Sequence, residues 1–213
     1  MFSAAPLDQR SHRYNGLNID PRVVVVADGA FGNGFFVDKW RDTVVTAWHV
    51  VEGSASVKIE AQSSDSARST VWFDACAVAW DGSRDLAVIR LPGSVRGFTT
   101  PLQARVPHTA VEAVLQGYES YDAWRAAPRR WRKWQAVTAA PSGDWLVYGE
   151  TNASGEPQPS PGLNGFSGGA VIEPGSGEVI GVHHGAIANE SNRASMFSLD
   201  LIDQLRSKAY EIG

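Results

Sequence analysis

The sequence predicts an all-β protein made of two β units in series and ended by one α-helix. Short segments rich in Val, Ile, Phe, Trp and Thr recur along the chain between clusters of Gly, Pro, Asn, Asp and Ser, a pattern typical of antiparallel sandwiches and barrels. Helical periodicity is nearly absent before the C-terminal residues. With 213 residues, 43% of them hydrophobic and 20% charged, the chain is long enough for one large all-β domain or two small ones.

The first β unit is expected at residues 21–105, after an N-terminal extension at residues 1–20. Its predicted strands are apolar segments separated by turn-forming residues. They are Arg22–Ala27, Gly34–Asp38, Thr43–Thr46, Ser56–Ala61, Thr70–Ala79 and Leu86–Leu91. These strands together are sufficient to close one barrel.

The second β unit is expected at residues 106–198, after a connection near Arg105. Proline and glycine, which interrupt strands, are concentrated there at Pro92, Gly93, Gly97, Pro101 and Pro107. The predicted strands that follow are Val111–Gln116, Trp131–Thr138, Trp145–Tyr148, Ala170–Glu173, Val179–His183 and Ala194–Ser198.

The C-terminal residues 199–213 are predicted to form an α-helix. Apolar residues recur there at spacings that place them on one helical face, at Leu201, Ile202, Leu205 and Ala209. Asp200 is the expected N-terminal cap, and Asp203 falls in the first turn, where a carboxylate interacts favourably with the helix dipole.

Charge and cysteine content restrict the partners and the compartment. The net charge of −4 gives no general attraction to nucleic acid or to an anionic membrane. The single cysteine, Cys76, cannot form an internal disulfide, as suits a reducing compartment. Residues 1–14 lack the apolar segment of a signal peptide, and no segment reaches the length of a membrane span. We therefore expect a cytoplasmic protein without membrane contact.

A serine among glycines is the strongest local indication of chemistry. The segment Gly165–Gly169 reads Gly-Phe-Ser-Gly-Gly, and its glycines permit a sharp turn and close approach of a substrate. The backbone N–H groups of Gly165 and Ser167 are candidates for an oxyanion hole. Because such a sequence often forms only a turn, the interpretation of Ser167 as a nucleophile requires a base and an acid elsewhere.

Two further segments supply those groups. His49 directly follows the predicted strand Thr43–Thr46, where the edge of a sheet would present it as a general base. Asp85 begins the predicted strand Leu86–Leu91 and is placed to orient an imidazole and to stabilise its charged form. The order along the chain is then His, Asp, Ser.

These three segments resemble those of the trypsin-like peptidase superfamily. His49 matches its Thr-Ala-x-His segment, Asp85 its Asp-Leu-Ala-Val segment, and Ser167 its Gly-x-Ser-Gly-Gly segment. The resemblance implies a chymotrypsin-like fold of two antiparallel six-stranded barrels, with His49 and Asp85 on the first and Ser167 on the second. It also implies a bacterial serine endopeptidase that acts on protein or peptide substrates through an acyl-enzyme, with no metal and no organic cofactor.

Phe166 departs from the digestive members of this superfamily, which have an acidic residue before the serine. An apolar side chain cannot pair with a newly formed N-terminus, so that route of activation is not expected. The uncharged residue is compatible with the high-temperature-requirement type of bacterial and organelle members, which usually have Asn there. A latent enzyme, controlled by residues 1–20 or by a regulatory partner protein, is therefore an open alternative.

The segment Glu178–Gly185 resembles the substrate-lining strand of bacterial glutamyl endopeptidases. This resemblance makes His183, His184 and Gly185 candidate substrate-binding residues and implies a preference for an acidic P1 residue. The alternative is that His183 packs in the wall of an apolar pocket. A zinc site joining His49 to both His183 and His184 is not expected, since neighbouring residues of a strand point to opposite faces.

The segment Trp124–Trp134 interleaves cationic and aromatic residues, as nucleic-acid-binding surfaces often do. The negative net charge disfavours nucleic acid. A strand whose long basic side chains cover apolar surface explains the pattern better. The non-enzyme alternative is a catalytically silent trypsin-fold module that binds a partner or nucleic acid through Arg125–Trp134.

Overall fold

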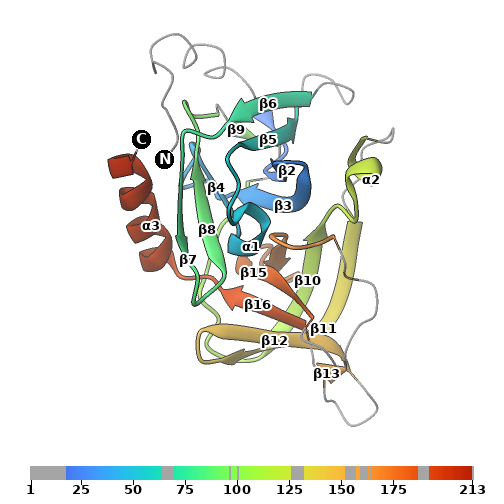
Figure 1. Cartoon of the computed structure of the whole chain (residues 1–213). Helices are drawn as coiled ribbons and strands as arrows, with labels where there is room; N and C mark the ends of the chain where they lie inside the picture. The colour runs from blue at the N-terminus through green and yellow to red at the C-terminus, as the bar shows by residue number, and fades with distance from the viewer. Residues whose placement is uncertain are drawn as a thin grey trace.

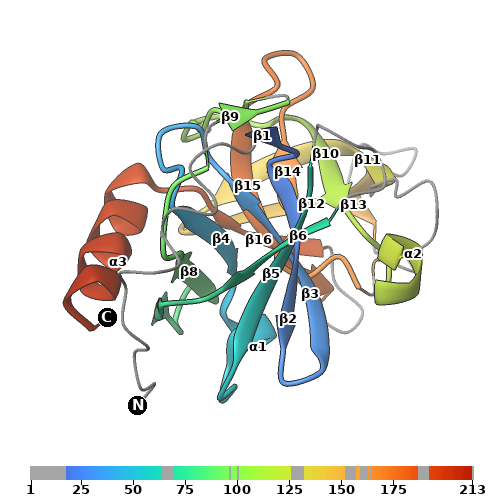
Figure 2. The same cartoon turned by 90° about the horizontal axis from the view of Figure 1, so that it is seen from above.

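The computed structural model describes residues 18–63, 70–95, 97–99, 101–125, 132–151, 157–158, 163, 165–186 and 192–212. Two curled antiparallel sheets lie one above the other in Figure 1, the first in blue to green and the second in yellow-green to red. A C-terminal helix lies beside the first sheet (Figures 1 and 2). The expected chymotrypsin-like, all-β architecture with a terminal helix is confirmed.

The first sheet curls into a barrel because its two edges are joined by a very short link. Its strand order is β6-β5-β2-β3-β4-β8-β7. The edge strands β6 and β7 are separated only by Ala75 and Cys76, whose backbone N–H groups donate to Val57 of β5 and Arg90 of β8. The single strand predicted at Thr70–Ala79 is therefore two strands. The bounds are β2 Arg22–Ala27, β3 Ala30–Phe36, β4 Thr43–Ala47, β5 Val57–Gln62, β6 Thr70–Asp74, β7 Ala77–Asp81 and β8 Leu86–Arg90.

The second sheet closes through its own strand pairing. Its order is β11-β10-β14-β15-β16-β12-β13, and β11 also pairs with β12, which completes a ring of six strands with β13 at the outside. The bounds are β10 Val111–Gly117, β11 Arg132–Ser142, β12 Trp145–Thr151, β13 Pro157–Gln158, β14 Ala170–Ile172, β15 Val179–Ala186 and β16 Asn192–Met196. The chain passes from the first sheet to the second near Arg105, whose N–H donates to Val179 of β15. The domain boundary at this residue stays a prediction.

Several short elements have no counterpart among the predicted ones. A parallel pair joins β1 (Asn18–Ile19) to β9 (Gly97–Phe98), and two short helices, α1 (Trp48–Val51) and α2 (Tyr121–Arg125), follow β4 and β10. Two-residue strands and single helical turns are shorter than any reliable hydrophobic periodicity, which is why the sequence pattern does not reveal them.

The C-terminal helix α3 (Leu199–Ile212) packs on the first barrel although it follows the second. Its buried residues Ile202, Leu205 and Ala209 belong to an apolar cluster that also contains Val88 of β8. The cap differs from the prediction, because Asp200 lies inside the helix and Ser198 is the residue that accepts the N–H of Leu201 at 3.3 Å. A residue with an extended backbone before the first turn is better placed to accept such a bond.

The same cluster joins the two barrels and fixes their relative position. Phe35 and Val45 come from the first sheet, and Val182 of β15 and Phe197 from the second half of the chain. Each of these four side chains is at most 1% exposed. Separate apolar clusters fill the two barrel interiors. The residues at the junction of the barrels are therefore held by continuous packing.

Candidate active site

His49 and Asp85 meet because the strands next to them are paired. In the β4–β8 ladder Ala47 lies opposite Leu86, so His49 in α1 and Asp85 before β8 fall at the same end of neighbouring strands. The N–H of Trp48 donates to the carbonyl of Asp85 at 3.0 Å. Asp85 has a positive φ of 47°, a conformation that is uncommon outside glycine and that often marks functional positions.

The Asp85 carboxylate holds His49 through both of its oxygens. Oδ1 accepts the backbone N–H of His49 at 2.8 Å, and Oδ2 lies 2.6 Å from His49 Nδ1. Burial by itself raises the pKa of Asp85, but hydrogen bonds from His184, from the His49 ring and from the His49 backbone outweigh it and hold that pKa well below its usual range. Asp85 is therefore ionised and keeps Nδ1 as the protonated nitrogen of neutral His49.

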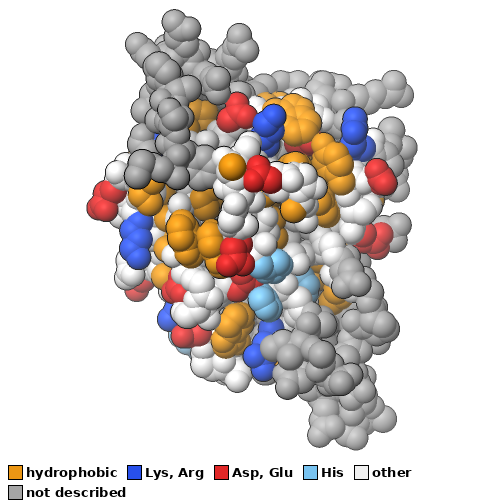
Figure 3. Space-filling model, in the orientation of Figure 1, with side chains coloured by type: hydrophobic (Ala, Val, Ile, Leu, Met, Phe, Trp, Pro, Cys, Tyr) orange, Lys and Arg blue, Asp and Glu red, His pale blue; other side chains and the backbone are white. Residues whose placement is uncertain are grey.

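Ser167 lies in the turn before β14, on the second barrel. Its Oγ donates to the carbonyl of His184 at 3.4 Å, and among the described residues this is the only hydrogen bond of the Oγ. The His49 and His184 rings lie edge to face, with centroids 5.2 Å apart. The structure thus brings all three predicted triad residues to the junction of the barrels, where Figure 3 shows histidine side chains beside acidic ones. A bond between Ser167 and His49 is not formed.

The turn before Ser167 depends on a glycine in a left-handed backbone conformation. Gly165 has a φ of +93°, and a Cβ there would lie 1.9 Å from the carbonyl oxygen of Glu119. In the described part of the chain, the N–H groups of Gly165 and Ser167 have no hydrogen-bond partner. Both amides are therefore available to an oxyanion.

Asn33 of β3 fixes this turn from the first barrel, a role that the sequence pattern did not reveal. Its Nδ2 donates to the carbonyls of Gly165 at 2.7 Å and Tyr118 at 3.1 Å, and its backbone N–H donates to the carbonyl of Ser167 at 2.7 Å. Thr46 Oγ1 in turn donates to the Asn33 carbonyl at 2.6 Å. A polar residue between Gly32 and Gly34 in an otherwise apolar strand was the available signal.

Comparison with known proteins identifies the family to which this arrangement of two barrels belongs. The family model described as a trypsin-like peptidase domain matches residues 32–182. The chain belongs to the trypsin-like peptidase family. No curated protein matches it.

Three solved structures illustrate the structural similarity of this trypsin-like peptidase. The Rv3671c protease from M. tuberculosis in its active form is 20% identical with a TM-score of 0.56, covering 98% of this chain and 92% of that one. The serine endoprotease from Yersinia pestis is 17% identical with a TM-score of 0.57, and the match covers 97% of this chain and 67% of that one. A scabies mite inactivated protease paralogue, S-D1, is 14% identical with a TM-score of 0.63, covering 92% and 98%.

His183 lies inside the second half of this peptidase and not on its surface. Its side chain is fully buried, and burial lowers its pKa to about 3, with smaller contributions from His184 and His49. Its backbone braces the serine turn, because its carbonyl accepts the N–H of Gly168 at 2.8 Å and its N–H donates to Gly169 at 2.9 Å. The imidazole is therefore neutral at physiological pH.

His184 points away from that interior and contacts Asp85. Its Nδ1 is hydrogen-bonded to Asp85 Oδ2, the oxygen that also holds His49. The ring of Trp145 packs against it, with centroids 5.8 Å apart. His184 and Gly185 are half-buried at the site. The resemblance marked His184 only as a substrate-lining residue, so its contact with Asp85 is a finding of the structure.

The segment Arg125–Trp134 of this peptidase falls largely outside the described residues. Residues 126–131 and the side chains of 132–134 are not described. Trp124, which precedes them, is fully buried, and its Nε1 donates to Glu60 of β5. Tyr121 donates its hydroxyl to the same carboxylate. Trp124 is thus part of the core and is unavailable as a stacking surface.

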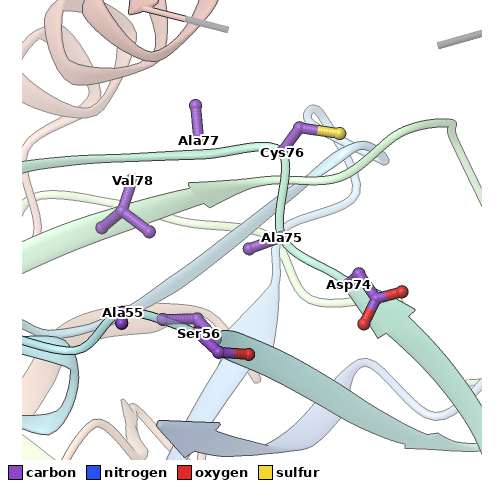
Figure 4. A pocket seen from close by; sticks show the side chains of 8 residues that line it. Ala55, Ser56, Asp74, Ala75, Cys76, Ala77 and Val78 are labelled. Atoms are coloured by element: carbon purple, nitrogen blue, oxygen red, sulfur yellow. The ribbon is translucent and has the colours of Figure 1, made fainter. Parts of the chain in front are cut away.

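One pocket of this peptidase lies away from His49, Asp85 and Ser167. It is formed at the start of β5 and around the β6–β7 link, and Figure 4 shows Ser56, Asp74, Cys76 and Val78 along it. None of the predicted site residues contributes to it. In the part of the chain that the structure describes, none of the helices has the length and hydrophobicity of a transmembrane span.

Proposed function

We propose that this trypsin-like peptidase is a serine endopeptidase in which Ser167 is the nucleophile, His49 the general base and Asp85 the residue that orients His49. The observation that best supports this proposal is the double contact between His49 and the ionised Asp85, across the barrel junction from Ser167. Neutral His49 then donates its Nδ1–H to Asp85 and has a free lone pair on Nε2.

The reaction would proceed by acyl transfer. Ser167 Oγ leaves the carbonyl of His184, gives its proton to His49 Nε2 and attacks the scissile carbonyl carbon. The backbone amides of Gly165 and Ser167 donate to the oxyanion. His49 then protonates the departing amine. In the second half of the reaction, His49 takes a proton from water, and this water attacks the acyl carbon and releases the acyl group from Ser167.

Hydrolysis of an unfolded protein substrate by purified variants tests the proposal. Ser167→Ala and His49→Ala should each lower kcat by several orders of magnitude, and Asp85→Asn by about 10⁴-fold, because it favours the wrong His49 tautomer. Ser176→Ala, at an exposed serine in the β14–β15 turn, is the matched control and should keep the wild-type rate. Full activity of Ser167→Ala would refute the proposal.

An acidic P1 preference is a separate, finer hypothesis. It is supported by the similarity of Glu178–Gly185 to the substrate strand of glutamyl endopeptidases. Because His183 is buried and its pKa is about 3, it would serve only as a neutral hydrogen-bond donor to such a substrate. A peptide library with every residue at P1 tests this: selection of Glu and Asp is expected, and indifference to them would refute it.

A catalytically silent or latent protein is the second candidate. It is favoured by the hydrogen bond of Ser167 Oγ to His184 instead of His49, and by the similarity of the fold to an inactivated protease paralogue. A latent enzyme would gain activity on removal of residues 1–17 or on addition of a partner protein. A silent module, with His49 and Asp85 unchanged, would stay inactive under both conditions.

A further inference from the structure

We propose that His49, Asp85 and His184 form a reversible Zn²⁺ site, and that metal bound there switches the triad off. The inhibitory consequence rests on the proposed function, but metal binding itself does not. From the sequence we expected no metal, and neighbouring His183 and His184 were not expected to share one ion. The structure separates them, since His183 faces the interior and His184 faces Asp85.

The three donor atoms already converge. One ligand atom from each residue, the ring nitrogens of the two histidines and a carboxylate oxygen of Asp85, lies within 4.8 Å of the other two. Both imidazoles use Nδ1 to contact the same oxygen, Asp85 Oδ2. The three residues come from three separate elements: His49 from α1, Asp85 from the turn before β8, and His184 from β15. The barrels must therefore be assembled for the site to exist.

The donor set is the kind that Zn²⁺ binds. Two imidazole nitrogens and one carboxylate oxygen supply three protein ligands at about 2.0–2.2 Å and leave a fourth position for water. The His49 and His184 side chains are 38% and 34% exposed, so an ion can reach them and their rings have room to separate around it. Asp85 stays in place because Oδ1 keeps the backbone N–H of His49.

His184 is not required by the proposed reaction. Orienting His49 needs one carboxylate contact, which Asp85 supplies alone, and the basic nitrogen of the triad is His49 Nε2. A second imidazole on Asp85 Oδ2, held by the edge contact with Trp145, therefore has no part in acyl transfer. Metal binding gives this second imidazole a purpose.

Occupation would inhibit by changing which His49 nitrogen holds the proton. Neutral imidazole carries one N–H, now on Nδ1 facing Asp85. When Zn²⁺ takes the Nδ1 lone pair, the proton resides on Nε2, so Nε2 becomes a donor and cannot accept the Ser167 proton. The ion exchanges water for protein ligands, and no redox step or co-reactant is involved. Removal of the ion restores the original tautomer.

Metal binding is tested on the Ser167→Ala protein, so that the result does not depend on enzymatic activity. Co²⁺ should bind with one ion per chain and give the visible absorption of a tetrahedral site, and Zn²⁺ should displace it. Adding His184→Ala or His184→Gln should weaken metal binding by at least about 10-fold. Loss of a residue that only hydrogen-bonds to a metal ligand already lowers metal affinity by about this factor, and His184 would be a ligand itself. His108→Ala, at an exposed histidine, is the control and should bind like the parent.

Inhibition is tested on the full chain with Ser167 present. Zn²⁺ should inhibit hydrolysis and a chelator should restore it, and the His184 variants should require at least about 10-fold more Zn²⁺ when each is normalised to its own metal-free rate. Thermal unfolding confirms that each variant is folded. Equal metal affinity with and without His184 would overturn the proposal. Failure of all proteins to hydrolyse substrate would count against the enzyme and leave the Co²⁺ result to decide the site.

Discussion

The side-chain amide of Asn33 donates to the carbonyl oxygen of Gly165 at 2.7 Å, so a residue of the first barrel holds the turn before Ser167 in the second. Phe166, next in the chain, is buried and cannot form the ion pair that orders this loop in digestive relatives. Asn33 also donates its backbone N–H to the Ser167 carbonyl. These contacts order the turn without a charged partner.

Asn33→Asp should therefore impair catalysis more than binding. The substitution keeps the shape of the side chain but replaces the donor with an oxygen that repels the carbonyls of Gly165 and Tyr118. We expect kcat to fall at least about 10-fold with a smaller change in KM, and the free energy of unfolding to fall by about 1–3 kcal/mol. Gln103→Glu introduces the same charge at an exposed position and should leave both quantities unchanged. Equal kcat values for the two variants would contradict the role of Asn33.

Gly165→Ala should abolish most of the activity because its Cβ would collide with the carbonyl of Glu119. Displacing the Gly165 N–H removes an oxyanion donor, which costs on the order of 10²–10³ in kcat. Gly177→Ala is the matched control, since Gly177 has a similar φ of +74° but open space around it. That variant should lose about 1–2 kcal/mol of stability and keep its kcat. Steady-state kinetics and urea unfolding of both variants make the comparison, and a common effect on kcat would contradict it.

His183 should make the folded state sensitive to mild acid. The unfolded chain takes up this proton near pH 6.5, whereas in the folded state the pKa is about 3. Between these values the unfolded state binds one more proton, so this residue makes stability rise with pH by about 1.4 kcal/mol per unit, and the stability is lost as the pH falls below about 6.5. The free energy of unfolding, measured with urea at several pH values, should rise less steeply with pH for His183→Gln than for wild type. His108→Gln should keep the wild-type slope, and identical slopes in all three proteins would refute the prediction.

Glu60 should stabilise helix α2 through two neutral donors. It is 2% exposed and accepts the Tyr121 hydroxyl and the Trp124 indole N–H. In Glu60→Gln one of these donors would face an amide NH₂, so the free energy of unfolding should fall by about 1–3 kcal/mol, with a red shift of Trp124 fluorescence. Glu112→Gln, on the exposed side of β10, should change stability by less than about 0.5 kcal/mol. Equal stability of the two variants would show that this carboxylate does not anchor α2.

Most strands, and the positions of His49, Asp85 and Ser167 at strand ends, could be predicted from the sequence because local patterns encode them. Alternating and continuous apolar segments predicted β2 with its observed bounds, and the three motifs placed His49, Asp85 and Ser167 at the ends of strands. The contacts of Asn33, His184 and Glu60 could not be predicted in this way. Each joins residues that are distant in sequence and depends on how the two barrels pack, which no local periodicity records.

The division between Thr70 and Ala79 illustrates the same limit. The apolar pattern there is continuous, yet the chain changes partner from β5 to β8 at Ala75 and Cys76. Strand pairing, and not side-chain pattern, sets that break. The predicted cytoplasmic location and the role of Arg125–Trp134 stay predictions.

Mapping the site of a fluorophosphonate adduct tests the central claim most directly. The reagent reacts with a serine hydroxyl activated by a histidine base, and peptide mass spectrometry identifies the residue that carries it. We predict one adduct, on Ser167, that is absent in Ser167→Ala and strongly reduced in His49→Ala. An adduct on a different residue, or labelling that survives loss of Ser167, would contradict the proposed mechanism.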